Sequence, residues 1–109
     1  MSSGWVVEFF DEAVKQDLAS LPLDMQAKFA HIRRLIEAFG LESVHEPYIK
    51  YLESNLWEMR LTGRDGIARA IYVAASKRRV VVVHVFVKKT EKTPRREIKA
   101  ASVRAKEVR

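Results

Sequence analysis

Basic side chains gather in the segment that follows a run of β-branched residues late in the chain. Five of the nine residues from position 88 to position 96 are lysine or arginine. A helix is predicted to begin within this segment, and the free N–H groups at a helix N-terminus attract phosphate. The cluster therefore indicates an anionic partner, with nucleic acid as the first candidate. Its basic members are Lys88, Lys89, Lys92, Arg95 and Arg96.

Two further arginines belong to a predicted β-hairpin. Residues 56–62 alternate between polar and apolar side chains, residues 67–74 form the returning strand, and a turn bounded by two glycines joins them. A hairpin centred on this turn brings Arg60 directly opposite Arg69. Like charges that face each other across two strands are destabilising, and an anion bound between them would remove that cost. The structural alternative is that one arginine pairs with a carboxylate such as Glu58.

The remaining residue types argue against several other kinds of site. The chain has no cysteine, which excludes disulfides, thiolate metal sites and a cysteine nucleophile. Its three histidines and scattered carboxylates form no recognisable ligand set, so we expect no metal and no cofactor. His84 could act as a general base at neutral pH. A single histidine within a run of valines is, however, more often packed in a core.

Charge is distributed unevenly along the 109 residues. The first 50 residues hold 8 acids and 5 bases, whereas residues 51–109 hold 6 acids and 15 bases, so the net charges are −3 and +9. This asymmetry again favours an anionic partner. The length and the 48% hydrophobic content fit one globular domain over residues 1–109. No transmembrane or signal segment is recognisable, and we expect a cytoplasmic protein with no membrane partner.

The elements that must carry these side chains follow from hydrophobic periodicity. The predicted order is a buried strand at 5–10, helices at 12–21 and 24–39, strands at 56–62, 67–74 and 80–87, and a helix at 94–109. Thr93 is predicted to cap the last helix, with Pro94 at its first position. Residues 41–55 have mixed signals and are expected to contain a loop. The prediction is therefore an α+β fold, with a helical hairpin packed on an antiparallel sheet meander. If helices cover one face of the sheet, the opposite face is an open basic platform suited to RNA phosphates.

Several short segments, taken in order, carry a family resemblance over nearly the whole chain. They read LWEMR at 56–60, ARAIY at 68–72, FVKKT at 86–90 and KTP at 92–94. The series resembles the RelE/ParE superfamily of toxins from type II toxin–antitoxin systems. Within that superfamily it is most similar to the HigB-like group, which includes phage-derived relatives.

The resemblance implies a RelE-like fold with an N-terminal strand, a helical hairpin on an antiparallel sheet, and a C-terminal helix. It also implies a metal-independent mRNA interferase, an endoribonuclease that cuts mRNA in the ribosomal A site. In such enzymes the ribose 2′-OH attacks the adjacent phosphate and leaves a 2′,3′-cyclic phosphate. By motif position, Arg60 and Arg69 would clamp the phosphate, Lys88 would take part in catalysis, and Lys50 would bind RNA with the basic cluster. RelE itself uses a C-terminal tyrosine, whereas this chain has none after Tyr72.

The partners implied are mRNA on the ribosome and a cognate helix-turn-helix antitoxin, with a homodimer left open. Two alternatives remain at this point. One is a ParE-like inhibitor of DNA gyrase on the same fold, and the other is an RNA-binding module without catalysis. The basic cluster and the arginine pair favour the RNA-cleaving alternative.

Overall fold

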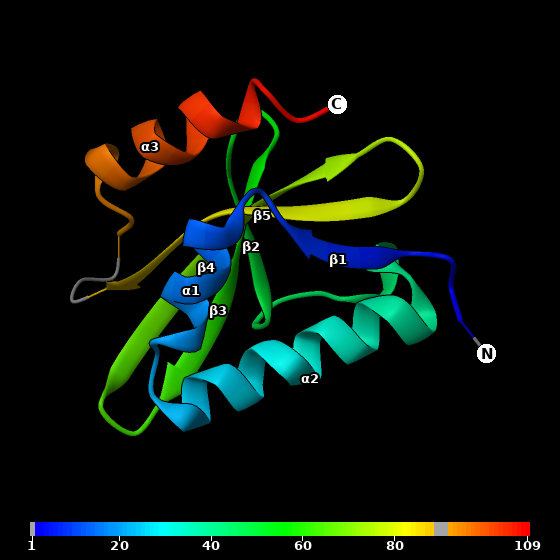
Figure 1. Ribbon diagram of the computed structural model, residues 1–109. Helices are drawn as coiled ribbons and strands as arrows, with labels where there is room; N and C mark the ends of the chain where they lie inside the picture. Colours follow the sequence, from blue (N-terminus) through cyan, green and yellow to red (C-terminus); the bar gives the residue numbers. More distant parts are fainter. Residues whose placement is uncertain (1, 89–91) are drawn as a thin grey trace.

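The computed structural model describes residues 2–88 and 92–109, and it has the predicted α+β architecture (Figure 1). Its elements are β1 (Val6–Phe9), α1 (Glu12–Ala19), α2 (Leu23–Phe39), the short 3₁₀ helix η1 (Leu41–Ser43), β2 (Ile49–Glu53), β3 (Leu56–Gly63), β4 (Gly66–Ala75), β5 (Arg79–Lys88) and α3 (Arg95–Ala105). No helix in the described part of the chain is long and apolar enough to cross a membrane.

The helical hairpin forms where the apolar spacing predicts it. Asp11 caps α1, because its carboxylate accepts a hydrogen bond of 2.9 Å from the backbone N–H of Val14. In α2, Met25, Phe29, Ile32 and Ile36 are buried at steps of three and four residues. The helix ends at Gly40, whose φ of +97° suits a residue without a Cβ.

The strands form one five-stranded sheet in the order β1-β5-β4-β3-β2. The meander of β3, β4 and β5 is antiparallel, and Arg60 lies directly opposite Arg69, as the hairpin register predicts. Two features go beyond the sequence prediction. The segment expected to contain a loop includes β2, which pairs antiparallel with β3, and β1 pairs parallel with β5.

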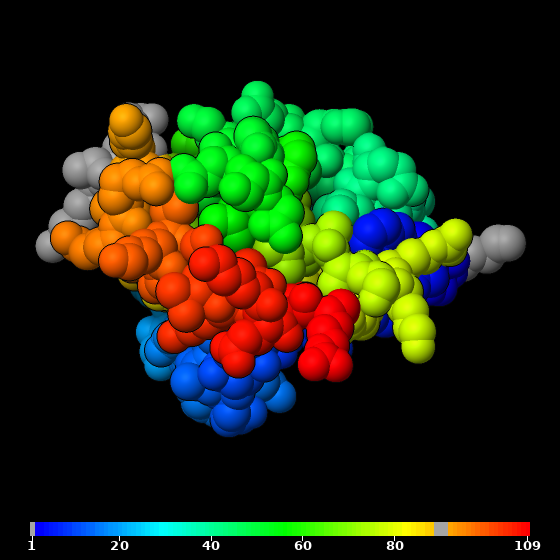
Figure 2. Space-filling view, turned by 90° about the horizontal axis from the view of Figure 1, so that it is seen from above, coloured from blue at the N-terminus to red at the C-terminus, as the bar shows by residue number. Residues whose placement is uncertain are grey.

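Helices lie on both faces of the sheet. The main core packs α1 and α2 against one face, through side chains such as Phe29, Met59 and Val82. A smaller apolar cluster packs Ile98 and Ala101 of α3 against the opposite face. The expectation that this second face is entirely open is therefore wrong, because α3 buries its own apolar side on part of it. Figure 2 shows α3, in orange and red, lying across this surface beside the green residues near position 50.

Candidate functional site

The strand register gathers the charged residues on the sheet face that α3 covers only in part. Lys50 of β2 lies opposite Glu58 of β3, and Arg60 of β3 lies opposite Arg69 of β4. Side chains opposite each other share a face, as do those two positions apart on one strand. Lys88 ends β5 two positions after Phe86, which lies opposite Arg69. We call Lys50, Glu58, Arg60, Arg69 and Lys88 the basic site.

A buried ion pair lies at the centre of the basic site. The Nε atom of Arg69 is 2.8 Å from Oε2 of Glu58, and each residue is only 1% exposed. The structural alternative considered for the arginines therefore applies to Arg69. Removing one partner of such a pair leaves an uncompensated buried charge, which is strongly destabilising. Glu58 thus fixes the position of Arg69 beneath the surface.

Thr93 connects this ion pair to the segment after β5. Its hydroxyl donates a hydrogen bond of 2.7 Å to Oε1 of Glu58, and it accepts one of 3.4 Å from Nζ of Lys88. The prediction that Thr93 caps the last helix is wrong, since α3 begins at Arg95 after Pro94 without a side-chain cap. The physical reason is that the second oxygen of a buried carboxylate needs a donor, and Thr93 supplies it.

The pKa of Lys88 depends on its burial and on the charges that surround it in the basic site. Burial lowers the pKa of Lys88, and the positive charge of Arg69 lowers that pKa further. The carboxylate of Glu58 acts in the opposite direction, while Lys50 and Arg60 make smaller contributions that again lower the pKa. Four cations thus surround one carboxylate within the described residues, and this arrangement favours a bound anion.

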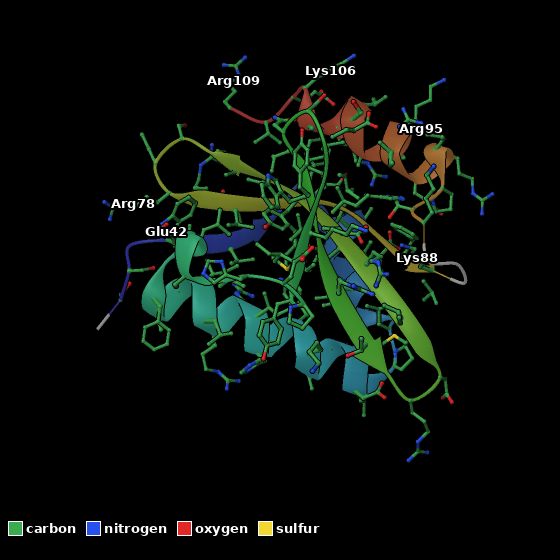
Figure 3. The ribbon with its side chains drawn as sticks, turned by 180° about the vertical axis from the view of Figure 1, so that it is seen from behind. Glu42, Arg78, Lys88, Arg95, Lys106 and Arg109 are labelled. Carbon is green, nitrogen blue, oxygen red and sulfur yellow. The ribbon has the colours of Figure 1, made fainter. Side chains whose placement is uncertain are left out.

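Depth separates the members of the basic site into two groups. Lys50 is exposed and Arg60 is half-buried, so both can reach an anion at the surface. Arg69 is 1% exposed and contributes its charge from below, whereas Lys88, at 7%, keeps a small part of its side chain exposed. Figure 3 shows Lys88 where β5 ends. The candidate site is therefore more enclosed than a flat RNA-binding platform.

The other predicted RNA contacts lie around this centre. Arg95 and Arg96 are exposed at the start of α3. Arg95, labelled in Figure 3, forms an ion pair with Glu53 of β2. The Nε atom of Arg96 lies 3.7 Å from Oε2 of Glu97. Lys92 is exposed. The fifth member of the basic cluster, Lys89, falls outside the described residues, so its prediction is untested.

His84 belongs to a different cluster, beneath α3. Its Nε2 atom lies 2.7 Å from Oε1 of Glu97, and its Nδ1 atom lies 3.2 Å from Nη1 of Arg104. Arg104 also donates a hydrogen bond of 2.8 Å to the carbonyl of Val83. Because a guanidinium can only donate, Nδ1 accepts and Nε2 carries the proton toward Glu97. His84 is therefore half-buried and paired with polar side chains of α3, and it joins α3 to the sheet without being packed in the apolar core.

The sequence pointed to Glu58 only as a carboxylate partner of an arginine, and it gave Thr93 a different role, that of a helix cap. Glu58 has the same strand parity as Arg60, which was the available signal that it shares the charged face. The contact of Thr93 with Glu58 was hidden by a different local pattern, because a threonine before a proline is typical of a helix start. Within the described residues, no group of three histidine or carboxylate side chains comes together as a metal site requires.

One protein family matches most of this chain. The family model described as phage-derived protein Gp49-like (DUF891) matches residues 16–106, which include the whole basic site. No curated protein sequence matches the chain significantly. Gp49-like proteins are a known family of RelE-like toxins, in agreement with the phage-derived group that the sequence resembles. The match covers most of the chain, and this protein belongs to the phage-derived Gp49-like family.

Proposed function

We propose that this protein is the toxin of a type II toxin–antitoxin system and acts as a metal-independent mRNA interferase on the ribosome. The observation that carries the proposal is the convergence of Lys50, Arg60, Arg69 and Lys88 around one buried carboxylate. An excess of fixed positive charge at a partly enclosed surface is suited to a reaction in which phosphate gains negative charge.

The proposed reaction needs this electrostatic environment at one step. The ribose 2′-oxygen loses its proton and forms a bond to the adjacent phosphorus, and the bond from phosphorus to the 5′-oxygen then breaks. The pentacoordinate transition state carries more negative charge than the ground state, so preorganised cations stabilise it preferentially. The products are a 2′,3′-cyclic phosphate and a 5′-hydroxyl, which gains the proton needed for balance.

Each member of the basic site has a distinct part in this proposal. Arg60, half-buried on β3, contacts the non-bridging phosphate oxygens. Arg69 strengthens the positive potential from below and is held there by Glu58. Lys88, with its lowered pKa, is a stronger acid than an ordinary lysine and donates the proton to the leaving 5′-oxygen.

The surrounding basic residues extend the proposed contact with RNA. Lys50, Lys89, Lys92, Arg95 and Arg96 would bind flanking phosphates of mRNA or of ribosomal RNA, which makes binding strongly dependent on salt. In this proposal the protein works in the cytoplasm, and its antitoxin is a helix-turn-helix protein that covers the basic site. A homodimer remains compatible with the proposal.

A cleavage map tests the proposal directly. The purified protein is stripped of metal with EDTA and dialysed, then incubated with a defined mRNA, as naked RNA and on translating ribosomes in magnesium buffer, and the new 5′ ends are mapped. We expect cuts only on the ribosome and in frame with the A-site codon. Arg60→Ala should abolish the cuts, whereas Arg104→Ala, a charge removal in the cluster beneath α3, should retain them.

Other outcomes would assign the fold to a different activity. If no cuts occur but RNA binding persists and weakens with salt, the protein is a non-catalytic RNA-binding module. If neither RNA activity occurs and DNA supercoiling by gyrase is inhibited, the ParE-like alternative replaces the proposal. Cuts that appear only when a transition metal is returned to the EDTA-treated protein would overturn the metal-independent mechanism.

A further inference from the structure

The two edge strands of the sheet, β1 and β2, differ in whether their outward backbone groups are bound by other parts of the chain. At the β1 edge, Arg33 of α2 donates a hydrogen bond of 2.9 Å to the carbonyl of Val7, and the N–H of Val7 donates one of 3.2 Å to Glu37. These contacts occupy the backbone groups to which another strand would bind. The opposite edge is β2, and among the described residues no further strand pairs with it.

The outward backbone groups of β2 can be identified from its ladder with β3. The N–H of Arg60 donates a hydrogen bond of 2.8 Å to the carbonyl of Tyr48. Bonded and non-bonded pairs alternate in an antiparallel ladder, so Lys50, two positions later, also directs its N–H and C=O toward β3. The N–H and C=O groups of Ile49 and Tyr51 therefore face away from the sheet, where an added strand would pair with them.

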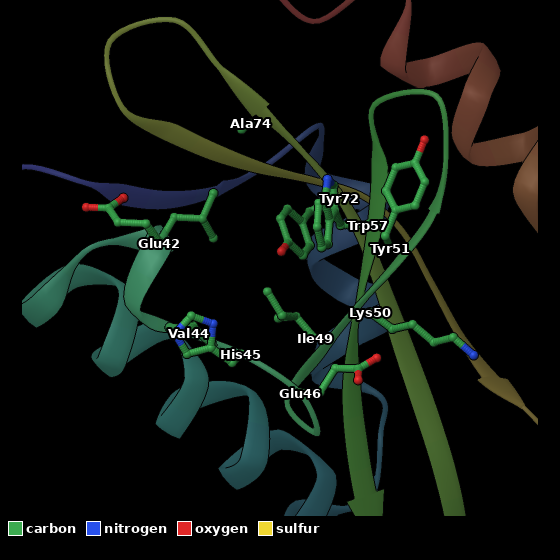
Figure 4. Close-up of a pocket in the computed structure, with 11 residues that line it drawn as sticks. Glu42, Val44, His45, Glu46, Ile49, Lys50, Tyr51, Trp57, Tyr72 and Ala74 are labelled. Atoms are coloured by element: carbon green, nitrogen blue, oxygen red, sulfur yellow. The ribbon is translucent and has the colours of Figure 1, made fainter.

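The two faces along this edge have opposite chemical character. On the α2 face, the edge borders a cavity of about 690 Å³. Its apolar and aromatic lining residues are Leu41, Val44, Ile49, Tyr51, Trp57, Tyr72 and Ala74, and its polar ones are Glu42, His45, Glu46 and Lys50. Tyr51 and Trp57 are 50% and 37% exposed, and their rings are 5.1 Å apart at the mouth. Figure 4 shows the amine of Lys50 pointing away from this cavity, on the other side of β2.

We propose that β2 and the adjoining cavity bind an extended segment of a partner protein in which apolar and acidic side chains alternate. Residues paired with an edge strand alternate between its two faces. Those opposite Ile49 and Tyr51 would enter the cavity, which suits large apolar side chains. Those opposite Lys50 would lie on the basic face, which suits aspartate or glutamate. The identification of this partner as the antitoxin rests on the proposed function.

Charge complementarity favours a peptide with this pattern over RNA. An RNA strand could satisfy Lys50, but it offers no regular row of backbone donors and acceptors for Ile49 and Tyr51. A bound peptide would also affect the basic site. A carboxylate opposite Lys50 would share the face of Arg60 and would compete with phosphate for the same positive potential.

The test measures binding of a fluorescein-labelled, end-capped peptide of four Leu-Glu repeats by fluorescence anisotropy. The decisive comparison is Tyr51→Pro against Tyr51→Ala. Both variants remove the aromatic ring, but only proline removes the outward N–H, and an edge position without a ladder bond tolerates it. We expect about tenfold weaker binding to Tyr51→Pro than to Tyr51→Ala, as for a lost backbone hydrogen bond and a disturbed pairing edge. Lys50→Glu should weaken binding to a similar degree at low salt.

A second comparison uses the unaltered protein, so it does not depend on the folding of a variant. A peptide of the same composition with its leucines N-methylated cannot donate those backbone hydrogen bonds, and we expect it not to bind. Equal binding of the two peptides, or of Tyr51→Pro and Tyr51→Ala, would overturn the proposal. An RNA oligonucleotide that binds through Trp57 where the peptide does not would also overturn it. Sedimentation tests whether β2 pairs with a second copy of this chain. A concentration-dependent dimer that Tyr51→Pro abolishes and Tyr51→Ala retains would also overturn the proposal.

These outcomes are separate from those of the cleavage map. Peptide binding without cleavage would leave the edge site intact and contradict the interferase proposal. Cleavage without peptide binding would support the interferase proposal and contradict the edge site.

Discussion

Two charged clusters on the sheet join it to the segment after β5, and their charge balance differs. In the basic site, Arg69 pairs with Glu58 while Lys50, Arg60 and Lys88 add further positive charge. In the second cluster, which we call the docking cluster, His84, Glu97 and Arg104 satisfy one another beneath α3. Both clusters contain one carboxylate that accepts from a neighbouring side chain.

Because of this difference in charge balance, we propose a functional role for the basic site and a structural role for the docking cluster. In the docking cluster the two contacts of His84 have partners in α3, so the cluster is complete within the chain. In the basic site, cations exceed the carboxylate, and burial followed by the charge of Arg69 lowers the pKa of Lys88, so the protein keeps buried like charges together at an energetic cost. Such an arrangement is more typical of a functional site than of an ion pair that only stabilises the fold.

The largest expected effect is on stability, at the buried ion pair of the basic site. Arg69→Met leaves the buried Glu58 carboxylate without its direct partner and with only the more distant cations of the basic site, so we expect a loss of about 3 kcal/mol in the free energy of unfolding, the lower end of the range for a broken buried pair. The double variant Arg69→Met with Glu58→Gln removes both charges and should recover part of that loss. Urea unfolding measures both. A single variant that unfolds at the wild-type urea concentration would contradict the importance of this pair.

The next effect is on catalysis and comes from Arg60, the half-buried member of the basic site. Arg60→Ala should lower the rate of mRNA cleavage about 10²–10³-fold, as for the loss of one preorganised donor to a charged transition state. The folded structure should persist, because Arg60 is not part of the buried ion pair. Single-turnover cleavage on ribosomes checks the rate, with Arg104→Ala as the matched control. Equal rates for the two variants would remove the distinction between the clusters.

A smaller effect is expected from the docking cluster. His84→Phe removes the contacts to Glu97 and Arg104 and should lower the free energy of unfolding by about 1.5–3 kcal/mol, the range for hydrogen bonds to charged groups. The cleavage rate should stay within about threefold of the wild type, well below the 10²-fold or larger loss expected for a general base. A folded variant with a hundredfold loss of cleavage would instead assign His84 to the reaction.

The comparison also explains how far the sequence could predict this molecule. Local periodicity was sufficient for α2 and for the opposition of Arg60 and Arg69, since both depend on spacing within one or two neighbouring elements. The strand β2 was not predicted, because Ile49–Glu53 is a short edge strand whose polar and apolar residues resemble a loop. Its pairing with β3 supplies what the local pattern lacks.

The depth and the partners of the site residues also depend on contacts between segments far apart in the sequence. Spacing identified its cations but not the depth at which each one lies. Glu58 and Arg69 belong to different strands, and their burial depends on how later segments cover the sheet. The role of Thr93 likewise depends on a contact with a residue 35 positions away. Long-range packing of this kind leaves no local pattern in a single sequence.

The smallest expected effect is the pH dependence of stability and cleavage that Lys88 gives to the basic site. Its folded-state pKa is lowered from 10.5, chiefly by burial and then by Arg69. Between the lowered pKa and 10.5, the unfolded chain binds more protons than the folded one, so stability should rise with pH across that window. Cleavage should fall over the same window, because the proposed proton donor is lost. Stability and activity are therefore expected to change in opposite directions.

Lys88→Arg separates this effect from other titrations, since an arginine keeps its charge throughout the window. Urea unfolding at a series of alkaline pH values should lose the rise in stability in this variant, and the fall in cleavage rate should be lost with it. If the wild type and Lys88→Arg have the same two profiles, another group titrates and Lys88 is not the proton donor. Arginine is too weak an acid to replace the proposed proton donor, so Lys88→Arg should cleave slowly throughout the series. If it instead keeps the wild-type rate and loses only the fall at alkaline pH, Lys88 contributes positive charge to the basic site without transferring a proton. The docking cluster predicts no such opposition, because it has no part in the proposed reaction.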